Sequence, residues 1–308
     1  MRIKKLKMNQ LEVFAAVVDA GIFNSAAVEL GCTQSRISHL VGELEAVLGT
    51  RLLLRSRLGC VVTESGQQVL TKARQILRIS DSIIQPPYDK KQVIGMVRIS
   101  CFRSVATHLL PYVLERLGNE YPGINLEIND GCADYADVIR DVDENVSDLG
   151  ISRGVFSKSI VSFPFISDAY VFVVPVTFKL DAPVSWEQFA DFPFIQTRNV
   201  GASWVTEQCR LAGFINTPVR KMVNESGIVA LIRRGMGFSI LPRLAAFNES
   251  EGVKIIDLPI DLKRRMELIC NESSYRLPLV KTVIKVIRDK QLIARSDAYR
   301  ARIIHIDY

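Results

Sequence analysis

The chain has 308 residues, of which 48% are hydrophobic, so it is long enough for two or three globular domains. Its longest apolar runs, such as residues 170–176, fall far short of the roughly 20 residues that span a bilayer. Acidic residues interrupt the basic amino end where a signal peptide would need an apolar stretch. We therefore expect a soluble cytoplasmic protein with no membrane partner. Six scattered cysteines without histidines at ligand spacing argue against a zinc site or a disulfide framework.

Positive charge is concentrated at the amino end of the chain. Residues 1–80 carry eleven Lys and Arg against six Asp and Glu, a net charge of +5 out of +6 for the whole chain. A basic amino-terminal quarter on a near-neutral body is typical of a polyanion-binding module attached to a larger domain. Charge alone leaves a solvated basic face as an equal alternative.

Three short helices are predicted near the amino end. Apolar spacing predicts a first helix over residues 8–19 and a second over 25–30, with Asn24 as its N-cap and Gly31 at its end. Thr33 is expected to cap the third helix, which Gly49 ends. One side of this third helix is an apolar stripe of Ile37, Leu40, Val41, Leu44 and Leu48. The opposite side is polar and consists of Ser35, Ser38, His39 and Gly42, flanked by Gln34 and Arg36.

Two short helices joined by a glycine turn, the second with a polar outer face, match the helix-turn-helix. Small donors and acceptors near the start of a helix can approach base edges in the major groove, and the first amides can meet a phosphate. A helical hairpin with a solvated face is the alternative, but the glycine turn, basic flanks and polar face coincide here. The expected DNA-binding residues on these helices are Asn24, Thr33, Gln34, Ser35, Arg36, Ser38 and His39.

A basic turn follows the third helix. Residues 52–54 are expected to return to the core, and Arg55 and Arg57 then lead into a predicted short strand over residues 60–62. This order is typical of a wing. Its two arginines are expected to contact phosphates beside the groove, which positions the module without reading sequence.

A longer helix is predicted from Thr63 to the Pro86-Pro87 pair. Its apolar side is a seam about three heptads long, which predicts dimerisation through a coiled coil. The seam consists of Val69, Ala73, Ile76, Ser80 and Ile83, with a second row of Leu70, Leu77 and Ile84. The alternative is that this side packs against its own domain.

The stretch from Met8 to Gly66 resembles the amino-terminal domain of LysR-type transcriptional regulators. The resemblance rests on Phe14, Gly21, Phe23, Ala26, Ala27, Thr33, Gln34, Ser35, Ser38, Leu44, Glu45, Leu48, Gly49, Leu52, Arg55, Thr63 and Gly66. Arg36 stands where the family usually has a small apolar residue, and His39 where it has Arg or Lys. Because both lie on or beside the reading face, the resemblance carries no base preference to this chain.

From residue 93 the pattern alternates between strands and helices, which predicts an α/β fold. Strands are expected over 97–101, 125–129, 148–151, 171–174, 194–196, 219–223, 238–241 and 267–270. Helices are expected over 107–121, 136–145, 203–212, 226–233 and 279–294. The runs PGINLEI, SDLGIS and IRRGMGFSILPR are similar to the family's effector domain, which has two Rossmann-like lobes as periplasmic binding proteins do. No role is assigned to the tail over residues 294–308.

The resemblance implies a division into three parts. Residues 1–62 would form the winged helix-turn-helix, residues 63–92 the linker helix and hinge, and residues 93–308 the effector domain. Within the last part, lobe I would comprise about 93–163 and 266–308, and lobe II about 164–265.

Small molecules in such a fold bind between the lobes, outside the carboxyl ends of strands and at helix amino ends. Ser104 is the strongest candidate, because the family often places a hydroxyl there to contact an effector. Arg103, Arg198 and the amides at the helix amino ends favour an anionic metabolite. The expected effector-binding residues are Arg103, Ser104, Asp130, Gly131, Gln196, Arg198, Asn199 and Gly201.

We weigh two other functions. Cys101 and Cys132 fall at the ends of strands that should be neighbours, where oxidation could move the lobes. A solute-binding or catalytic protein on the same fold would leave the first 90 residues without a role, and none of the three histidines lies in a nucleophile motif. We expect no catalytic residue, metal or cofactor. The expected partners are double-stranded DNA at a promoter, a small effector, and a second copy in a homodimer that pairs into a homotetramer, with RNA polymerase as a further candidate.

Overall fold

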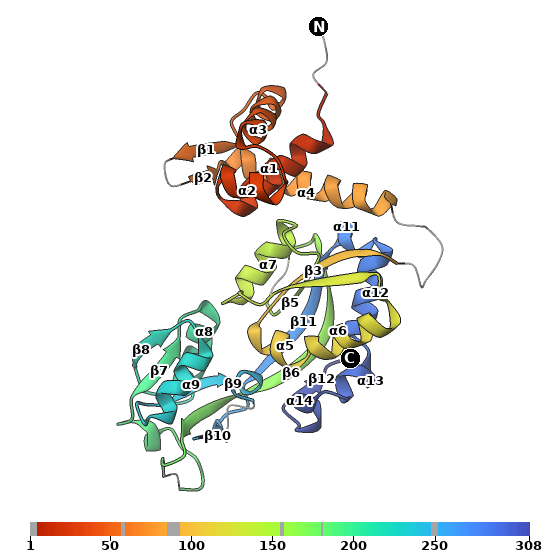
Figure 1. The fold of residues 1–308 in the computed structure, drawn as a ribbon. Coiled ribbons are helices and arrows are strands. Elements are labelled where there is room, and N and C mark those ends of the chain that lie inside the picture. The colour runs from red at the N-terminus through yellow and green to blue at the C-terminus, as the bar shows by residue number, and fades with distance from the viewer. Residues whose placement is uncertain (1–4, 57–58, 85–92, 155–156, 180, 248–251) are drawn as a thin grey trace. The chain divides into compact units, whose positions relative to one another are not determined.

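The computed structural model describes residues 5–56, 59–84, 93–154, 157–179, 181–247 and 252–308. The chain divides into two compact units, the first comprising residues 1–90 and 143–146 and the second comprising residues 91–142 and 147–308 (Figure 1). Arg57 of the predicted wing and the predicted hinge at 85–92 lie outside the described residues, as do the side chains of residues 81–84.

The first unit is a winged helix-turn-helix followed by a longer helix. Its elements are α1 (Met8–Ala20), α2 (Phe23–Glu29), α3 (Gln34–Leu48), β1 (Leu53–Ser56), β2 (Gly59–Val62) and α4 (Glu64–Ile84). The strands pair antiparallel as a hairpin. The Thr33 hydroxyl accepts a hydrogen bond from the Arg36 amide at 3.3 Å, and Gly49 ends α3 in the left-handed region with φ of 70°. The predicted start and end of the third helix are therefore confirmed.

The predicted N-cap of the second helix is wrong. This helix begins at Phe23, so Asn24 lies inside its first turn, is exposed, and makes no capping bond. The Phe23 side chain packs against the core of the unit, which draws the chain into the helix one residue earlier than the polar N-cap signal suggests. Residues 52–54 also need a correction, because Leu52 and Leu53 are buried whereas Leu54 is 56% exposed.

One apolar core joins α1, α2, α3, the hairpin and α4. Its largest side chains include Phe14 on α1 and Leu44 on α3, both with no exposed area. Gly66, at the start of α4, permits a close approach, because a Cβ atom there would lie 2.2 Å from the carbonyl oxygen of Leu52. The glycine in the sequence pattern thus marks the contact between α4 and the strand hairpin.

The predicted seam on α4 is wrong for its most buried members. Leu70 and Ala73 are each 1% exposed within the core of their own unit, and Leu77 packs partly against it. For Leu70, Ala73 and Leu77, the alternative interpretation therefore holds: they pack against the helix's own domain. Ile76 of the predicted seam is different, since it is 39% exposed, and so is Ile79, which the predicted seam did not include and which is 53% exposed.

The second unit begins with a parallel arrangement of strands and helices. Its first elements are β3 (Gly95–Cys101), α5 (Arg103–His108), α6 (Leu110–Glu120), β4 (Ile124–Asn129), α7 (Tyr135–Asp143) and β5 (Leu149–Ser152). Strand β3 pairs parallel with both β4 and β5. The helix predicted over 107–121 is broken at Leu109, because Pro111 in the first turn of α6 has no amide to continue a helix from α5.

A single long strand, β6 (Ile160–Pro175), runs through both halves of this unit. Its residues 160–169 pair with β11 (Lys263–Asn271), and residues 170–175 pair with β9 (Ser239–Pro242) and β10 (Val253–Asp257). The sequence predicted only residues 171–174 as strand, because Pro164 and several polar residues obscure the earlier part. A register shift opposite Met266 and Glu267 accommodates that stretch.

We call the part built on β3, β4 and β5 lobe I and the part built on β7 to β10 lobe II. Lobe II contains β7 (Phe194–Thr197), α8 (Val200–Leu211), β8 (Pro218–Met222), α9 (Glu225–Arg233) and α10 (Arg243–Ala246), besides β9 and β10. Strands β7 and β8 are parallel, and β10 was not predicted. Because β6 changes partners after Ala169, the chain passes between lobes about six residues later than the predicted boundary at 163.

The chain returns to lobe I through β11, α11 (Glu272–Tyr275) and α12 (Pro278–Ile287). The helix predicted over 279–294 is broken, because the Asp289 carboxylate accepts hydrogen bonds from the Gln291 and Leu292 amides and starts α13 (Lys290–Ala294). The unassigned tail then forms α14 (Asp297–Arg300) and β12 (Ile304–Ile306), which pairs antiparallel with β6.

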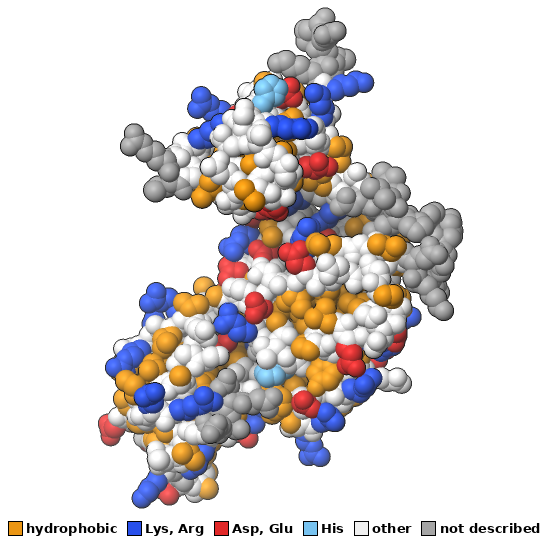
Figure 2. Space-filling model, viewed as in Figure 1, with side chains coloured by type: hydrophobic (Ala, Val, Ile, Leu, Met, Phe, Trp, Pro, Cys, Tyr) orange, Lys and Arg blue, Asp and Glu red, His pale blue; other side chains and the backbone are white. Residues whose placement is uncertain are grey.

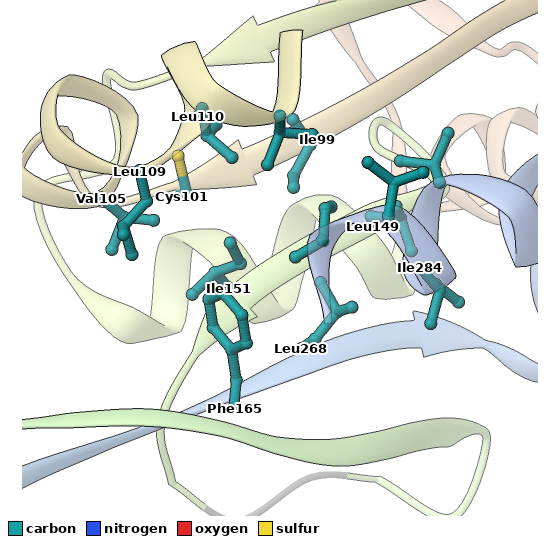
Figure 3. Packing of buried hydrophobic residues seen from close by; sticks show 14 of the residues in the cluster. Ile99, Cys101, Val105, Leu109, Leu110, Leu149, Ile151, Phe165, Leu268 and Ile284 are labelled. Atoms are coloured by element: carbon teal, nitrogen blue, oxygen red, sulfur yellow. The ribbon is translucent and has the colours of Figure 1, made fainter. Parts of the chain in front are cut away.

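The core of lobe I lies between its sheet and the helices α6 and α12. Figure 3 shows Ile99 and Leu149 from the sheet meeting Leu110 and Ile284 from the helices, with the Cys101 side chain in the same cluster. Among the described residues, no single helix has the length and apolar character to cross a membrane. Helices α1 and α2 meet that test only as a pair bent by 119°.

Candidate nucleic-acid interface and ligand cavity

The outer face of α3 carries the polar residues that the sequence singled out. Gln34, Ser35, Arg36 and His39 are exposed, and Ser38 is half-buried. The opposite stripe is fully buried, since Ile37, Val41 and Leu44 have no exposed area. Burial of one stripe therefore fixes which side chains α3 presents to solvent.

Arg55 of β1 is docked against this face. Its Nη1 donates a hydrogen bond to the Ser38 hydroxyl at 2.8 Å, and its guanidinium lies 4.3 Å from the centre of the Phe23 ring. The cation is therefore held beside the start of α3 by contacts to α3 and α2. Ser38 has its hydroxyl engaged by this arginine, which no sequence signal indicated.

A charged cluster lies one turn further along α3. The buried Gln10 side chain donates a hydrogen bond to the Glu43 carboxylate at 3.0 Å, and this bond lowers the pKa of Glu43, with Lys7 acting in the same direction. His39 Nδ1 lies 3.9 Å from the same carboxylate. The histidine that departs from the family pattern thus has an acidic neighbour on the next turn. Figure 2 shows basic side chains on the visible face of this unit.

A cavity of about 320 Å³ lies in the second unit, lined from both lobes. Five of the predicted effector-binding residues line it: Arg103, Asp130, Gly131, Asn199 and Gly201. Further lining residues that the sequence did not single out include Phe102, Asp134, Tyr135, Arg153, Tyr170, Glu225 and Arg264. Volume, mixed polarity and position between lobes suit a small metabolite.

The other three predicted residues do not line this cavity. Ser104 is 6% exposed, and its hydroxyl accepts a hydrogen bond from Arg264 Nη2 at 3.4 Å. Gln196 is buried and donates to the Thr206 hydroxyl at 2.7 Å. Arg198 is exposed to solvent. The rule that ligands bind at the carboxyl ends of strands found loops that line this cavity, but the direction of each side chain decided which residues reach it.

A buried ion pair forms one wall. Arg264 on β11 and Asp168 on β6 are register partners, and the guanidinium donates to both carboxylate oxygens, at 2.8 and 3.0 Å. The Leu244 amide donates to the same carboxylate at 2.8 Å. Burial is the largest single influence and would lower the pKa of Arg264, but the charge and hydrogen bonds of Asp168, together with Tyr170 and Glu225, outweigh it and the pKa is raised. The cation is thus permanent.

The remaining charged groups of the cavity are less fully paired. Arg103 lies 3.6 Å from the Asp130 carboxylate. Arg153 donates to the Tyr170 hydroxyl at 3.2 Å and lies over the Trp204 ring at 4.6 Å. Glu225, the first residue of α9, is half-buried, and burial raises its pKa although Arg264 and Arg103 oppose that shift.

The two cysteines weighed as a thiol switch are poor nucleophiles in this environment. Burial is the largest cause that raises the pKa of Cys101 to about 12 and that of Cys132 to about 12. Figure 3 shows Cys101 beside Val105, Leu109 and Leu110 in the lobe I core. Because the thiolate is the reactive form, both thiols are held in the unreactive state at neutral pH.

Within the described part of the chain, no group of three His, Cys, Asp or Glu residues is arranged to hold a metal ion. His108 makes an edge contact with the Phe247 ring at 5.2 Å, and His305 lies in β12.

Some cavity residues carried a usable signal. Glu225 follows β8 and opens α9, so the rule that was applied to the other strand ends would have found it. Asp134 lies at the end of the loop after β4, four residues beyond Asp130. Arg264 sits in the run Lys263-Arg264-Arg265, and nothing in such a run of charges indicates that one member is buried.

The sequence matches two family profiles. The profile described as "Bacterial regulatory helix-turn-helix protein, lysR family" matches residues 8–67, and that described as "LysR substrate binding domain" matches residues 90–291. The probable HTH-type transcriptional regulator LrrA of Synechococcus elongatus is 32% identical over 92% of this chain and 97% of its own. The uncharacterized HTH-type transcriptional regulator YeiE of Escherichia coli is 28% identical over 86% and 90%.

Solved structures show the same fold. Full-length OxyR from Pseudomonas aeruginosa, in a variant with one cysteine replaced by aspartate, superposes with a TM-score of 0.70 at 16% identity, covering 99% of both chains. Full-length CbnR in complex with its target DNA superposes with a TM-score of 0.54 at 20% identity, covering 92% of this chain and 99% of that one.

Replacing Glu225 with Gln should stabilise the protein near pH 8 but not near pH 4. Because burial raises the folded-state pKa of this carboxyl, its ionised form costs free energy on folding once the pH exceeds the unfolded-state pKa. That cost disappears when both states are protonated. We expect a gain below about 1 kcal/mol, since the group is only half-buried and water partly screens its charge.

Thermal unfolding at the two pH values measures this difference. Glu187→Gln is the control, because a hydrogen bond from Ser185 lowers the pKa of that exposed carboxyl, and no gain is expected there. An equal gain for Glu225→Gln at both pH values would contradict the assignment.

Proposed function

The chain belongs to the LysR family of DNA-binding transcriptional regulators with an effector-binding domain, and on this premise we propose which residues bind DNA and which bind the effector. The exposed face of α3, with Arg55 docked beside it, is the observation that carries the proposal. Gln34, Ser35, Arg36 and His39 approach base edges. The Thr33 end of α3 and the two wing arginines contact phosphates, and Asn24 lies on the neighbouring helix.

Ser38 has a modified role in this proposal. Its hydroxyl accepts a hydrogen bond from Arg55, so it orients the arginine at least as much as it contacts a base. The half-buried position of Ser38 supports this division, because a side chain that reads a base must reach beyond its neighbours. Arg57 keeps its expected phosphate role, from a position outside the described residues.

Dimerisation belongs to the same proposal. Two recognition helices are required to contact two half-sites about 34 Å apart. Ile76 and Ile79 are apolar, adjacent on the outer side of α4, and exposed, so they offer a surface for a second copy. We assign residues 63–92 to this linker, residues 1–62 to DNA reading and residues 93–308 to sensing. Pairing of dimers into a homotetramer and contact with RNA polymerase extend the proposal.

The cavity between the lobes is the proposed effector site. Arg103, Arg153 and the loops at Gly131 and Gly201 surround a volume suited to a small metabolite. An effector acts only if it binds one arrangement of the lobes more tightly than another. Contact with both lobes satisfies that requirement. Arg103 and Arg153 offer positive charge to an anionic molecule, beside the acidic residues Asp130, Asp134 and Glu225 of the same lining.

A thiol sensor is the less favoured mechanism. The chain shares only 16% sequence identity with OxyR, so the likeness between the two proteins concerns the fold alone. Burial raises the pKa of Cys101 and Cys132 to about 12, which removes the thiolate needed for oxidation at neutral pH. A bound metabolite therefore accounts better for the cavity.

Arg36→Ala should change the preference of the protein among operator sequences. Arg55→Ala should instead weaken binding to all sequences, and the slope of log affinity against log salt concentration should become shallower by about one unit. The reason is that base contacts specify and phosphate contacts position. Mobility shifts on the promoter of its own operon and on random DNA, over a range of salt, measure both effects. Arg276→Ala, an exposed arginine of the second unit, is the control. Equal losses on specific and random DNA would remove Arg36 from the reading residues.

Ile79→Asp should weaken self-association by at least about tenfold, because it buries an unpaired charge in the proposed contact. Val28→Asp, at an exposed apolar position on α2, should leave association unchanged. Light scattering at micromolar concentration measures the mass. A fully dimeric Ile79→Asp variant with native thermal stability would contradict dimerisation through this side of α4.

Arg103→Ala should reduce the transcriptional response to the inducer at least about tenfold while operator affinity without inducer stays within about twofold. Arg98→Ala is a matched control, because both side chains are 49% exposed and paired with a carboxylate of lobe I, but only Arg103 lines the cavity. A reporter fusion and mobility shifts measure the two quantities. An unchanged response to the inducer would contradict the assignment of this cavity as the effector site.

A further inference from the structure

The face of lobe I formed by β12, β6 and β11 is hollowed. Strand β6 lies between the other two, because its residues 166–168 pair with β12 along one edge and with β11 along the other. A hollow of about 650 Å³ lies over β6, where Pro164 and Ser167 line it between the longer side chains of β11 and β12. It shares no lining residue with the cavity between the lobes, so it is a separate feature of the surface.

The pairing register arranges the charged side chains of this face in two rows. Ser167 is the register partner of both Arg265 on β11 and His305 on β12, which gives a row with basic side chains at its two ends. Glu267 and Asp307 lie two residues further along the same outer strands and also line the hollow. They form a second, acidic row beside the first.

A row of apolar residues separates the two charged rows. Met266 and Ile306 are both register partners of Ile166, so these three residues lie side by side across the three strands. Their side chains belong to the core of lobe I or pack against it, because successive residues of a strand point to opposite faces. On each outer strand the basic and acidic residues are therefore about 7 Å apart, on either side of this apolar row.

The charged groups of the two rows are available to a partner. Among the described residues, Arg265, Glu267 and His305 form no ion pair, whereas the neighbouring Lys263 is paired with an aspartate at 3.2 Å. Asp307 is engaged through one oxygen, Oδ1, which accepts a hydrogen bond from a serine of β6 at 2.9 Å. Glu267 is half-buried and the other three residues of the rows are exposed to solvent.

A two-fold axis turns this arrangement onto its own complement. When a second copy lies face to face with the first and the axis runs across the strands along the apolar row, each strand faces its own copy in the opposite direction. Arg265 then lies opposite Glu267 of the other copy, and His305 lies opposite Asp307. An isologous contact repeats each such pair with the two copies exchanged. Every group of both rows thus meets a group of opposite charge or a hydrogen-bond partner.

We propose that two dimers of this chain meet through this face, so that its occupant is a second copy paired through Arg265 and Glu267. The inference rests on the proposed dimer and on its pairing into a homotetramer, for which it supplies the surface. A dimer carries the face twice, so two contacts can close a tetramer and neither needs to be strong alone. Monomers of the Ile79→Asp variant therefore do not associate through it at micromolar concentration.

Charge reversal in the full-length protein tests the contact, with the mass measured by light scattering at micromolar concentration and low salt. The wild type should have the mass of four chains. Arg265→Glu and Glu267→Arg should each give the mass of two chains, with the dissociation constant of the tetramer raised at least about tenfold, because each variant places like charges opposite one another. The double variant Arg265→Glu/Glu267→Arg should regain four chains, since the axis then pairs the reversed charges again.

Arg276→Glu is the control, because it changes the net charge as much as Arg265→Glu does but lies on α11 with its own glutamate partner. It should keep the mass of four chains. Raising sodium chloride from about 0.05 M to about 0.5 M should convert the wild type and the double variant to two chains, because exposed charge pairs are screened. Thermal unfolding checks that each variant is folded.

Four results would each overturn the proposal: a wild type of two chains at low salt, single variants that keep four chains, a double variant that stays at two, or a tetramer that salt does not dissociate. A double variant that stays at two would indicate that the charges bind another molecule and not their own copies. All of these variants keep α4 unchanged, so a failure of the proposed dimer would appear separately, as the mass of one chain.

Discussion

The buried pair of Arg264 and Asp168 is the interaction on which the sensing unit depends. It joins β6 and β11 next to the point where β6 exchanges β11 for β9 and β10. The carboxylate also fixes the start of α10 through Leu244, and the guanidinium holds the Ser104 hydroxyl at the start of α5. Removing one partner of such a pair typically costs about 3–5 kcal/mol, because the other charge is left buried. Both lobes are therefore anchored to one fixed point.

That anchor determines which groups are free to bind a ligand. Because Arg264 is matched by Asp168 and occupied with Ser104, its charge contributes to the wall of the cavity without needing a ligand. Glu225 and Arg153 reach the cavity from the two lobes with fewer partners. In the proposed effector site, the groups available to a ligand are thus those that the fold has left incompletely paired. The rule of strand ends alone selects a different set of residues.

The sequence predicted the parts whose signals are local. Thr33 and Gly49 bound α3, and the apolar stripe fixed its outer face, so the exposed polar face that we propose reads DNA could be named before the structure. The seam on α4 failed because Leu70 has the same spacing whether it faces a partner or its own core. The long β6 was underestimated since its burial comes from contacts with β11, about a hundred residues away. Asp134 was missed because the amides at the start of α8, which donate hydrogen bonds to it, lie 66 and 67 residues further along the chain.

The two carboxylates that bridge parts of the sensing unit differ in how costly their contacts are to break. Asp168 has no exposed side-chain area, so its contacts are exchanged for water only at a cost beyond what a small ligand supplies. Asp134, which accepts hydrogen bonds from the Val200 and Gly201 amides of α8, is half-exposed, and a hydrogen bond to a charged group is worth about 1.5–3 kcal/mol before water screening reduces it. Coupling free energies between sites are typically about 1–3 kcal/mol. The contact at α8 thus lies within the range of a typical coupling free energy, whereas the fully buried pair at β6 and β11 is far costlier to break.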